Sequence, residues 1–278
     1  MRDQEVVKQN KIYSKIRGPL KNSTEAHVTS ELKAISNYSK FYEKLLYPNR
    51  ESNLKIRNGI DRLNRLKIGV QYPFLIKVYK NFAAGTITEE TFCSVLKTIE
   101  SYFIRRHLSK IPTHSLNRLF AELCKLPDTN IDVALVKNLA QRENWAVQYW
   151  PKDTEFREQF HTAPVYKLSL DKCRFILETL EEDYKHPEPV MLEDLWIEHI
   201  MPETLDTNWQ DYLGEEWESI HENYVHTIGN LTLIAASPNA SIQNESFAEK
   251  RKDWYSQSNI SLTREINQKW TEWKKMKS

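Results

Sequence analysis

The feature that most constrains the fold is an apolar stripe that recurs at helical spacing up to about residue 185. Between Phe92 and Phe103, large apolar residues lie three or four positions apart, and the same spacing returns in residues 54–66, 116–123 and 173–184. Such spacing places apolar side chains on one face of an α-helix. Thr86 to Glu89 forms a capping-box pattern just before the Phe92 stripe. Only 6 glycines in 278 residues argue against an all-β fold, so we expect residues 1–186 to form a helical domain.

The pattern changes at residues 186–189, His-Pro-Glu-Pro, where two prolines predict a stiff turn and a domain boundary. After it, residues 190–197 and 228–234 read as strands, and residues 244–256 and 262–275 read as closing helices. The predicted order in residues 187–278 is strand, loop, strand, helix. The expected fold class is therefore mainly α with a small α+β part.

The cysteines and the hydropathy pattern indicate a cytoplasmic protein. Cys93, Cys124 and Cys173 lie at spacings that fit no metal-binding motif, and we expect them to be reduced core thiols. No apolar run approaches the ~20 residues that span a bilayer, and the N-terminus shows no apolar signal-peptide core. We expect no membrane association.

Charge is strongly segregated along the chain, although the formal net charge is only +1. Residues 186–249 contain 13 Asp and Glu but no Lys or Arg. Residues 50–80 hold eight Lys and Arg against two acids, and residues 250–278 hold eight against three. Such segregation gives local fields that the net charge hides, so binding to a polyanion remains possible.

An ordered set of polar residues in the last 90 positions points to phosphodiester chemistry. Glu198-His199 follows the first predicted strand, Asn230 lies in a Gly-Asn-Leu segment at the second, and Asn239 and Lys250 follow. A neutral imidazole can deprotonate water, and carboxylate and amide oxygens suit a hard divalent cation. Each piece alone has a plainer explanation, since a single His is usually structural and the Asn could simply form a turn. The ordered set is more specific, and its layout is that of HNH (ββα-metal) nucleases.

The segment "IEHIMPETL…W…HTIGNLTLIAASPNASIQNESFAEKRKDWYSQS" resembles the C-terminal nuclease domain of GmrSD-type, modification-dependent (type IV) restriction enzymes and their relatives in phosphorothioate-linked phage defence. The helical segment "LKTIESYFIRRHLSKIPTHSLNRLFAEL" resembles the region before that nuclease domain. The resemblance implies a metal-dependent DNA endonuclease of restriction systems with an HNH domain at residues 187–278. The family's N-terminal NTP-dependent sensor, with its Asp-Gly-Gln-Gln-Arg motif, does not occur in this sequence. We therefore expect the sensor to be a missing domain or a separate subunit.

The resemblance also implies roles for individual residues. His199 is expected to be the general base, with Asn230 holding its loop, and Glu198 and Asn239 are expected to bind one Mg²⁺ or Mn²⁺ ion. Many HNH nucleases have Asp at the position where this sequence has Glu198. Further support of the site is expected from His226, Asn244 and Lys250. A non-catalytic DNA-binding or assembly module that keeps the HNH scaffold is the alternative.

DNA binding would need cations outside the acidic segment. The sequence offers a C-terminal set and a set on the helical domain: Lys250, Arg251, Arg62, Arg65 and Arg106. The plainer interpretation of Arg106 is a favourable interaction with the C-terminal end of its helix dipole. Each phosphate contact adds about −0.9 to the slope of log affinity against log salt, so we expect the helical domain to contribute to this slope.

Overall fold

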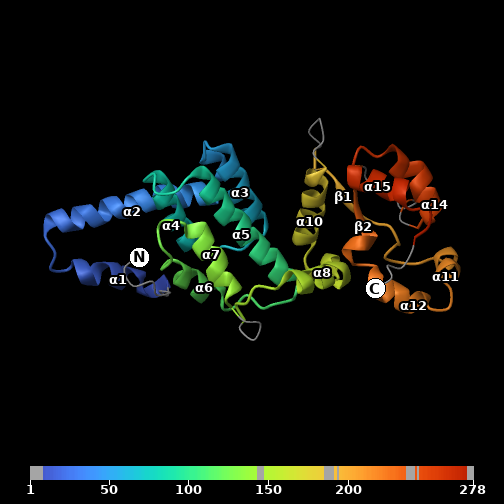
Figure 1. Cartoon of the computed structure of the whole chain (residues 1–278), viewed down its shortest axis with the longest axis horizontal. Helices are drawn as coiled ribbons and strands as arrows, with labels where there is room; N and C mark the ends of the chain where they lie inside the picture. The colour runs from blue at the N-terminus through green and yellow to red at the C-terminus, as the bar shows by residue number, and fades with distance from the viewer. Residues whose placement is uncertain are drawn as a thin grey trace. The chain divides into compact units, whose positions relative to one another are not determined.

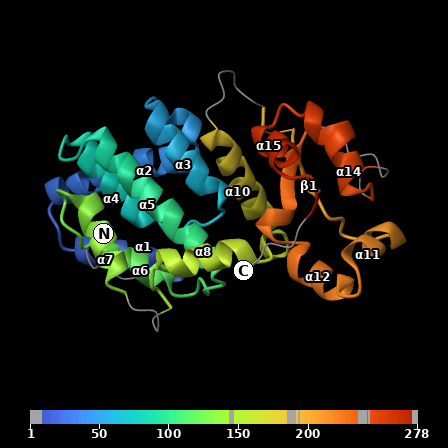
Figure 2. The ribbon, with the colours of Figure 1, turned by 45° about the vertical axis from the view of Figure 1, so that its right-hand side comes forward.

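The computed structural model describes residues 9–142, 147–184, 191–192, 194–235, 242 and 244–273, and it divides into two compact units, Met1–Pro151 and Lys152–Ser278. Figures 1 and 2 show helices throughout the first unit, and helices around two short strands in the second. These observations confirm a mainly helical chain with a small sheet. The unit boundary lies before the predicted one at residue 186, because helices within residues 153–183 contact the second strand and the short 3-10 helix before it.

In the described part of the first unit, helices joined by turns and loops are the secondary structure. Its elements are η1 Gln9–Lys11, α1 Ile12–Leu20, α2 Glu25–Leu46, η2 Pro48–Arg50, α3 Leu54–Arg65, α4 Tyr72–Ala83, α5 Glu89–Leu108, α6 Leu116–Leu123 and α7 Ile131–Ala140. Helix α5 carries the stripe from Phe92 to Phe103, and all six of its apolar residues are buried. It packs against α3 and α7 (Figure 1). The helix begins at Glu89, and its N-cap is Thr88, whose hydroxyl accepts from the Thr91 amide. The capping box predicted to start at Thr86 therefore begins two residues too early.

Helices α3 and α5 approach closely at one glycine. A Cβ atom at Gly59 would lie 2.7 Å from Cδ1 of Leu96 on α5, which is closer than side-chain atoms approach one another. The absent side chain therefore lets α3 pack directly on α5. The apolar face of α3 predicted from the sequence is confirmed at Ile56, Ile60 and Leu63, all of which are buried.

The second unit is built around a two-stranded antiparallel sheet. Its elements are α8 Asp153–Thr162, α9 Val165–Leu168, α10 Leu170–Asp183, β1 Trp196–His199, α11 Thr207–Leu213, α12 Trp217–Tyr224, η3 Ile228–Asn230, β2 Leu231–Ile234, α14 Phe247–Glu249, the π-helical turn η4 Lys250–Trp254, η5 Tyr255–Gln257 and α15 Ser261–Lys269. Strand β1 begins later than predicted, and residues 190 and 193 of the predicted strand lie outside the described residues. The predicted helix at 244–256 is divided into α14, η4 and η5.

Buried polar contacts hold helices α10 and α15 to this sheet. The carboxylate of Glu181 on α10 is fully buried and accepts hydrogen bonds from the amides of Ser261 and Leu262, at 2.7 and 2.8 Å. It therefore satisfies amide groups in the first turn of α15, which have no partner within their own helix. Thr263, in the same turn, donates to the carbonyl of Leu233 on β2 at 2.6 Å. These contacts make α10 and α15 part of the framework that supports β1 and β2.

Candidate functional site

His199 is the last residue of β1 and lies in a buried cluster of rings. Register pairs it with Leu231 on β2, and it is 8% exposed. Its ring meets the ring of Tyr166, from α9, edge to face at a centroid distance of 4.5 Å. The ring of His226, just before η3, lies 5.5 Å away and is also nearly perpendicular to it. Tyr166 and His226 stack at 5.5 Å with only 7° between their planes. The structure thus brings together two of the histidines singled out in the sequence.

A carboxylate completes this cluster. Oε2 of Glu203 lies 3.9 Å from Nδ1 of His199, and its side chain is half exposed. One potential ligand atom from each of His199, Glu203 and His226 lies within 4.8 Å of the others, which is close enough for one metal ion to contact all three. The cluster is called the His-Glu-His cluster below.

Burial keeps both imidazoles neutral. It lowers the pKa of His199 to about 3, with smaller contributions from the charges of His226, Lys250 and His221. Burial also lowers the pKa of His226, with a contribution from Lys167. Nε2 of His199 and Nδ1 of His226 are buried, and neither has a hydrogen-bond partner among the described residues. Buried polar atoms without partners are rare and costly, so both nitrogens are suited to a ligand, a metal ion or a water molecule.

Asn230 ties together the backbone around this cluster. Its Nδ2 donates to the carbonyls of Met201 and Val225, both at 2.9 Å. Its Oδ1 accepts from the Met201 amide at 2.8 Å and from the indole nitrogen of Trp273 at 2.9 Å. The amide group thus uses both donors and both lone pairs, which fixes the loop after His199 to the segment that carries His226.

Glu198 lies on the other face of β1, because neighbouring strand residues point to opposite sides. Its Oε1 accepts a 2.7 Å hydrogen bond from Nζ of Lys250, which also donates to the carbonyl of His199 at 2.7 Å. Lys250 is 0% exposed and Glu198 is 4% exposed. The prediction that Lys250 contacts DNA is therefore wrong, because its ammonium group is buried in an ion pair. Glu198 is engaged in that pair, outside the His-Glu-His cluster.

The other cations proposed for DNA binding are also engaged. Arg106 is only 2% exposed and donates to the carbonyl of Pro112 at 2.6 Å, so the prediction that it contacts DNA is wrong. Arg62 makes a two-bond pair with Glu100, both bonds at 2.8 Å. Arg251 donates to the carbonyl of Asn267 near the end of α15 at 2.9 Å. Arg65 is half-buried and has partners of its own. Burial and pairing of this kind depend on the tertiary fold and cannot be read from charge counts.

Of the two remaining predicted residues, one lies outside the described residues and the other lies away from the cluster. Asn239 lies outside the described residues. Asn244 is exposed in the turn before α14, and within the described part of the chain no contact joins it to His199 or His226.

Sequence reasoning missed Glu203 and Tyr166. Glu203 stands four residues after His199, a spacing that could have suggested a pair. Tyr166 lies before the predicted domain boundary, and no pattern near it in the sequence points to the site. Its backbone amide donates to the carbonyl of His226 at 3.3 Å, a long-range contact that only the fold creates.

Residues 150–277 match the family model of the GmrSD restriction endonucleases, C-terminal domain. This segment is similar to the C-terminal domain of GmrSD restriction endonucleases. The match contains Tyr166, the whole His-Glu-His cluster and Asn230, and it confirms the resemblance of the C-terminal segment. It indicates a restriction nuclease role in defence, with DNA as the substrate that a nuclease of this kind implies. No curated protein matches the sequence.

The match to the GmrSD C-terminal domain starts at residue 150, close to the structural boundary after Pro151. Helices α8 to α10 thus belong to the domain that carries the cluster. Along the described parts of the chain, no helix combines the length and apolar character needed to cross a bilayer.

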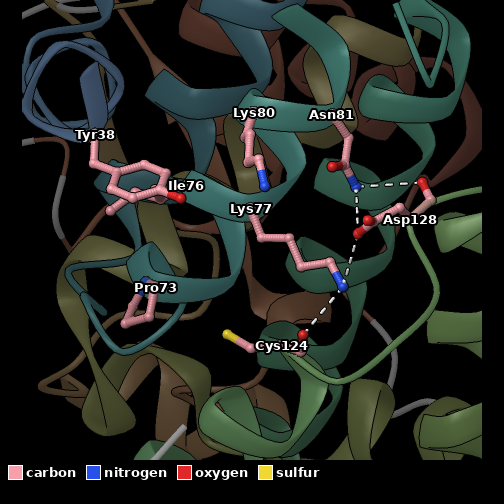
Figure 3. A pocket seen from close by; sticks show the side chains of 8 residues that line it. All are labelled: Tyr38, Pro73, Ile76, Lys77, Lys80, Asn81, Cys124 and Asp128. Atoms are coloured by element: carbon pink, nitrogen blue, oxygen red, sulfur yellow. Dashed lines mark hydrogen bonds and ion pairs between the residues drawn. The ribbon is translucent and has the colours of Figure 1, made fainter. Parts of the chain in front are cut away.

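The first unit contains a cavity of about 200 Å³ with two lysines in its wall. Figure 3 shows Lys77 reaching toward Asp128 and the carbonyl of Cys124. Its ammonium group lies 3.1 Å from each of these acceptors and also bonds to the carbonyl of Leu126. Asn81 donates to Asp128 as well, at 3.2 Å. These polar groups hold the segment after α6 in place, so this cavity is a weaker candidate for a reactive site than the His-Glu-His cluster.

Proposed function

We propose that the GmrSD-type C-terminal domain is a metal-dependent DNA endonuclease of the HNH (ββα-metal) type that acts in restriction of foreign DNA in the cytoplasm. One observation carries the proposal: two buried, neutral imidazoles with unpartnered nitrogens lie beside a carboxylate in a domain of a restriction endonuclease family. Hydrolysis of a phosphodiester requires a base for the attacking water and positive charge near the phosphate. The cluster has groups for both.

In this proposal His199 is the general base, and Nε2 accepts the proton of the attacking water. The low pKa keeps the ring unprotonated at neutral pH. An incoming phosphate brings negative charge that raises this pKa, toward the range where a base is most effective. Asn230 keeps the loop after His199 in position, through its hydrogen bonds to Met201.

A divalent cation would be held by His226 and Glu203, within reach of His199. The unpartnered nitrogen of His226 and the half-exposed carboxylate of Glu203 fit such an ion. When bound, the ion supplies positive charge to the reacting phosphate. A ligand set that contains imidazole binds Mn²⁺, Co²⁺ and Ni²⁺ more readily than Mg²⁺, which prefers oxygen. We therefore propose a transition ion such as Mn²⁺ ahead of Mg²⁺, and Asn239 stays a proposed additional oxygen ligand.

The proposal assigns Glu198 a structural role through Lys250, in place of direct metal binding. Recognition of modified DNA is assigned to an NTP-dependent sensor domain or subunit. A non-catalytic DNA-binding module would have the same fold, and activity measurements separate the two.

A plasmid-nicking assay tests the function. The full chain should convert supercoiled plasmid to nicked or linear DNA with Mn²⁺, and EDTA should abolish the reaction. His199→Ala should lower the rate by about 10²–10⁴-fold, as expected for loss of a general base. His161→Ala is the matched control, because His161 is exposed on α8 and far in sequence from the cluster. Full activity of a folded His199→Ala protein, or full activity in excess EDTA, would contradict the mechanism.

A further inference from the structure

Tyr166 contacts both histidines of the cluster, although no sequence pattern predicted a role for it. Its ring lies parallel to His226 and nearly perpendicular to His199, so it borders both imidazoles at once. Its amide also donates to the backbone carbonyl of His226 at 3.3 Å. One residue of α9 therefore contacts both the ring and the backbone of His226, and the ring of His199.

These contacts restrict the rotation of the two imidazole rings, which sets where their ring nitrogens point. An imidazole on a strand end can rotate about its Cβ–Cγ bond, which would turn Nε2 of His199 away from a substrate. The edge-to-face contact at 4.5 Å with Tyr166 blocks this rotation on one side, and the perpendicular contact with His226 limits it on another. Aromatic pairs of this kind contribute about 0.5–1.5 kcal/mol beyond the area they bury. Nε2 of His199 and Nδ1 of His226 have no hydrogen-bond partner among the described residues, so these two nitrogens do not hold the rings in place.

We infer that Tyr166 is a positioning residue of the site, whose ring holds His199 and His226 in the orientation that serves base catalysis and metal binding. This inference rests on the proposed function for its catalytic part only. It also explains why the domain must begin before residue 166, since a fragment that starts at 187 lacks one wall of the site.

The phenol hydroxyl is not needed for this role. Burial, with the nearby charge of Glu203, raises the pKa of Tyr166, so the group stays neutral. The ring alone makes the contacts with the histidines. Phenylalanine should therefore replace tyrosine, whereas alanine should not.

The test compares Tyr166→Phe, Tyr166→Leu and Tyr166→Ala in the full chain, with three measurements. Misplacement of a catalytic group by about 1 Å can cost on the order of 10²-fold in rate, so kcat of Tyr166→Ala should fall by about 10–100-fold with little change in KM for DNA. Its Mn²⁺ affinity, from calorimetry, should fall as well. Tyr166→Phe should keep both values within about threefold. Tyr166→Leu fills part of the space without a flat ring, and it should resemble Tyr166→Ala. That result would show that the loss in Tyr166→Ala is not caused only by the cavity it leaves.

The third measurement is independent of activity. In spectra of the histidine side chains, the ring signals of His199 and His226 should be sharp in the wild type and in Tyr166→Phe, and broadened or shifted in Tyr166→Ala. Tyr184→Ala is the matched control, because Tyr184 is an exposed tyrosine at the end of α10. A Tyr166→Ala protein with unchanged ring signals, Mn²⁺ affinity and kcat overturns the inference. Absence of nuclease activity in the wild type would refute the proposed function alone, because the ring signals would still report on Tyr166.

Discussion

The buried ion pair between Glu198 and Lys250 gives the sharpest prediction about stability. The two side chains are 5% and 0% exposed and their charged atoms are 2.7 Å apart. Removal of one partner from a buried pair typically costs 3–5 kcal/mol, because the other charge stays buried without compensation. Lys250→Met should therefore destabilise the sheet by about 3–5 kcal/mol. It also leaves the carbonyl of His199 without this donor, which adds about 1 kcal/mol.

The assay is hydrogen exchange of the backbone amides in β1 and β2, which reports the free energy of opening of the sheet separately from the first unit. A second variant, Glu198→Leu with Lys250→Met, removes both charges and should recover most of the loss, since apolar replacements of buried pairs are often neutral or stabilising. The matched control is Lys269→Met, which breaks an exposed i,i+4 pair with Glu265 and should cost less than about 1 kcal/mol. If Lys250→Met costs no more than Lys269→Met, or if the double variant is worse than the single one, the reasoning about the buried pair is wrong.

Three further predictions follow from the site and the charges. Burial lowers the pKa of His199 to about 3 from 6.5, so between these pH values the unfolded chain binds a proton that the folded chain does not. The free energy of unfolding should therefore fall by up to about 1.4 kcal/mol per pH unit as the pH is lowered through this range. His199→Asn should remove this part of the pH dependence in urea titrations at several pH values. Glu203→Gln should weaken Mn²⁺ binding measured by calorimetry, whereas the main effect of Glu198→Gln should be a lower free energy of unfolding. Equal Mn²⁺ affinity of the wild type and Glu203→Gln would exclude Glu203 as a ligand. Since Glu100 already neutralises Arg62, Arg62→Ala should leave the salt slope of DNA binding unchanged, and a slope flatter by about 0.9 would mean that Arg62 contacts a phosphate after all.

Much of the helical fold could be predicted because its apolar residues follow one period. The Phe92–Phe103 stripe of α5 and the Leu116–Leu123 stripe of α6 are buried as expected. Strand β1 was harder, because its buried residues Glu198 and His199 are polar and its first residue, Trp196, is exposed. Hydrophobic alternation cannot find a strand that buries an ion pair and an imidazole.

The site could be predicted only where chemistry and position in the chain coincide. His199, His226 and Asn230 stand close to the two strands, and their residue types suggested a role. Tyr166 reaches the site through the packing of α9, which no local pattern indicates. The roles of Lys250 and Arg106 were misjudged because a sequence shows that a cation is present but does not show whether it is buried.

The hydrogen bond from Trp273 to Asn230 has a consequence for the order of events during synthesis. The side-chain amide of Asn230 anchors the loop after His199. One of the two hydrogen bonds that its Oδ1 accepts comes from Trp273, 43 positions further along the chain. A nascent chain has β1 and β2 long before it has Trp273, so its loop is held by three of the four hydrogen bonds of Asn230 at most. The complete anchor forms only when nearly the whole domain has left the ribosome. The loop after His199 therefore gains its last anchoring hydrogen bond only once Trp273 has been synthesised and packed.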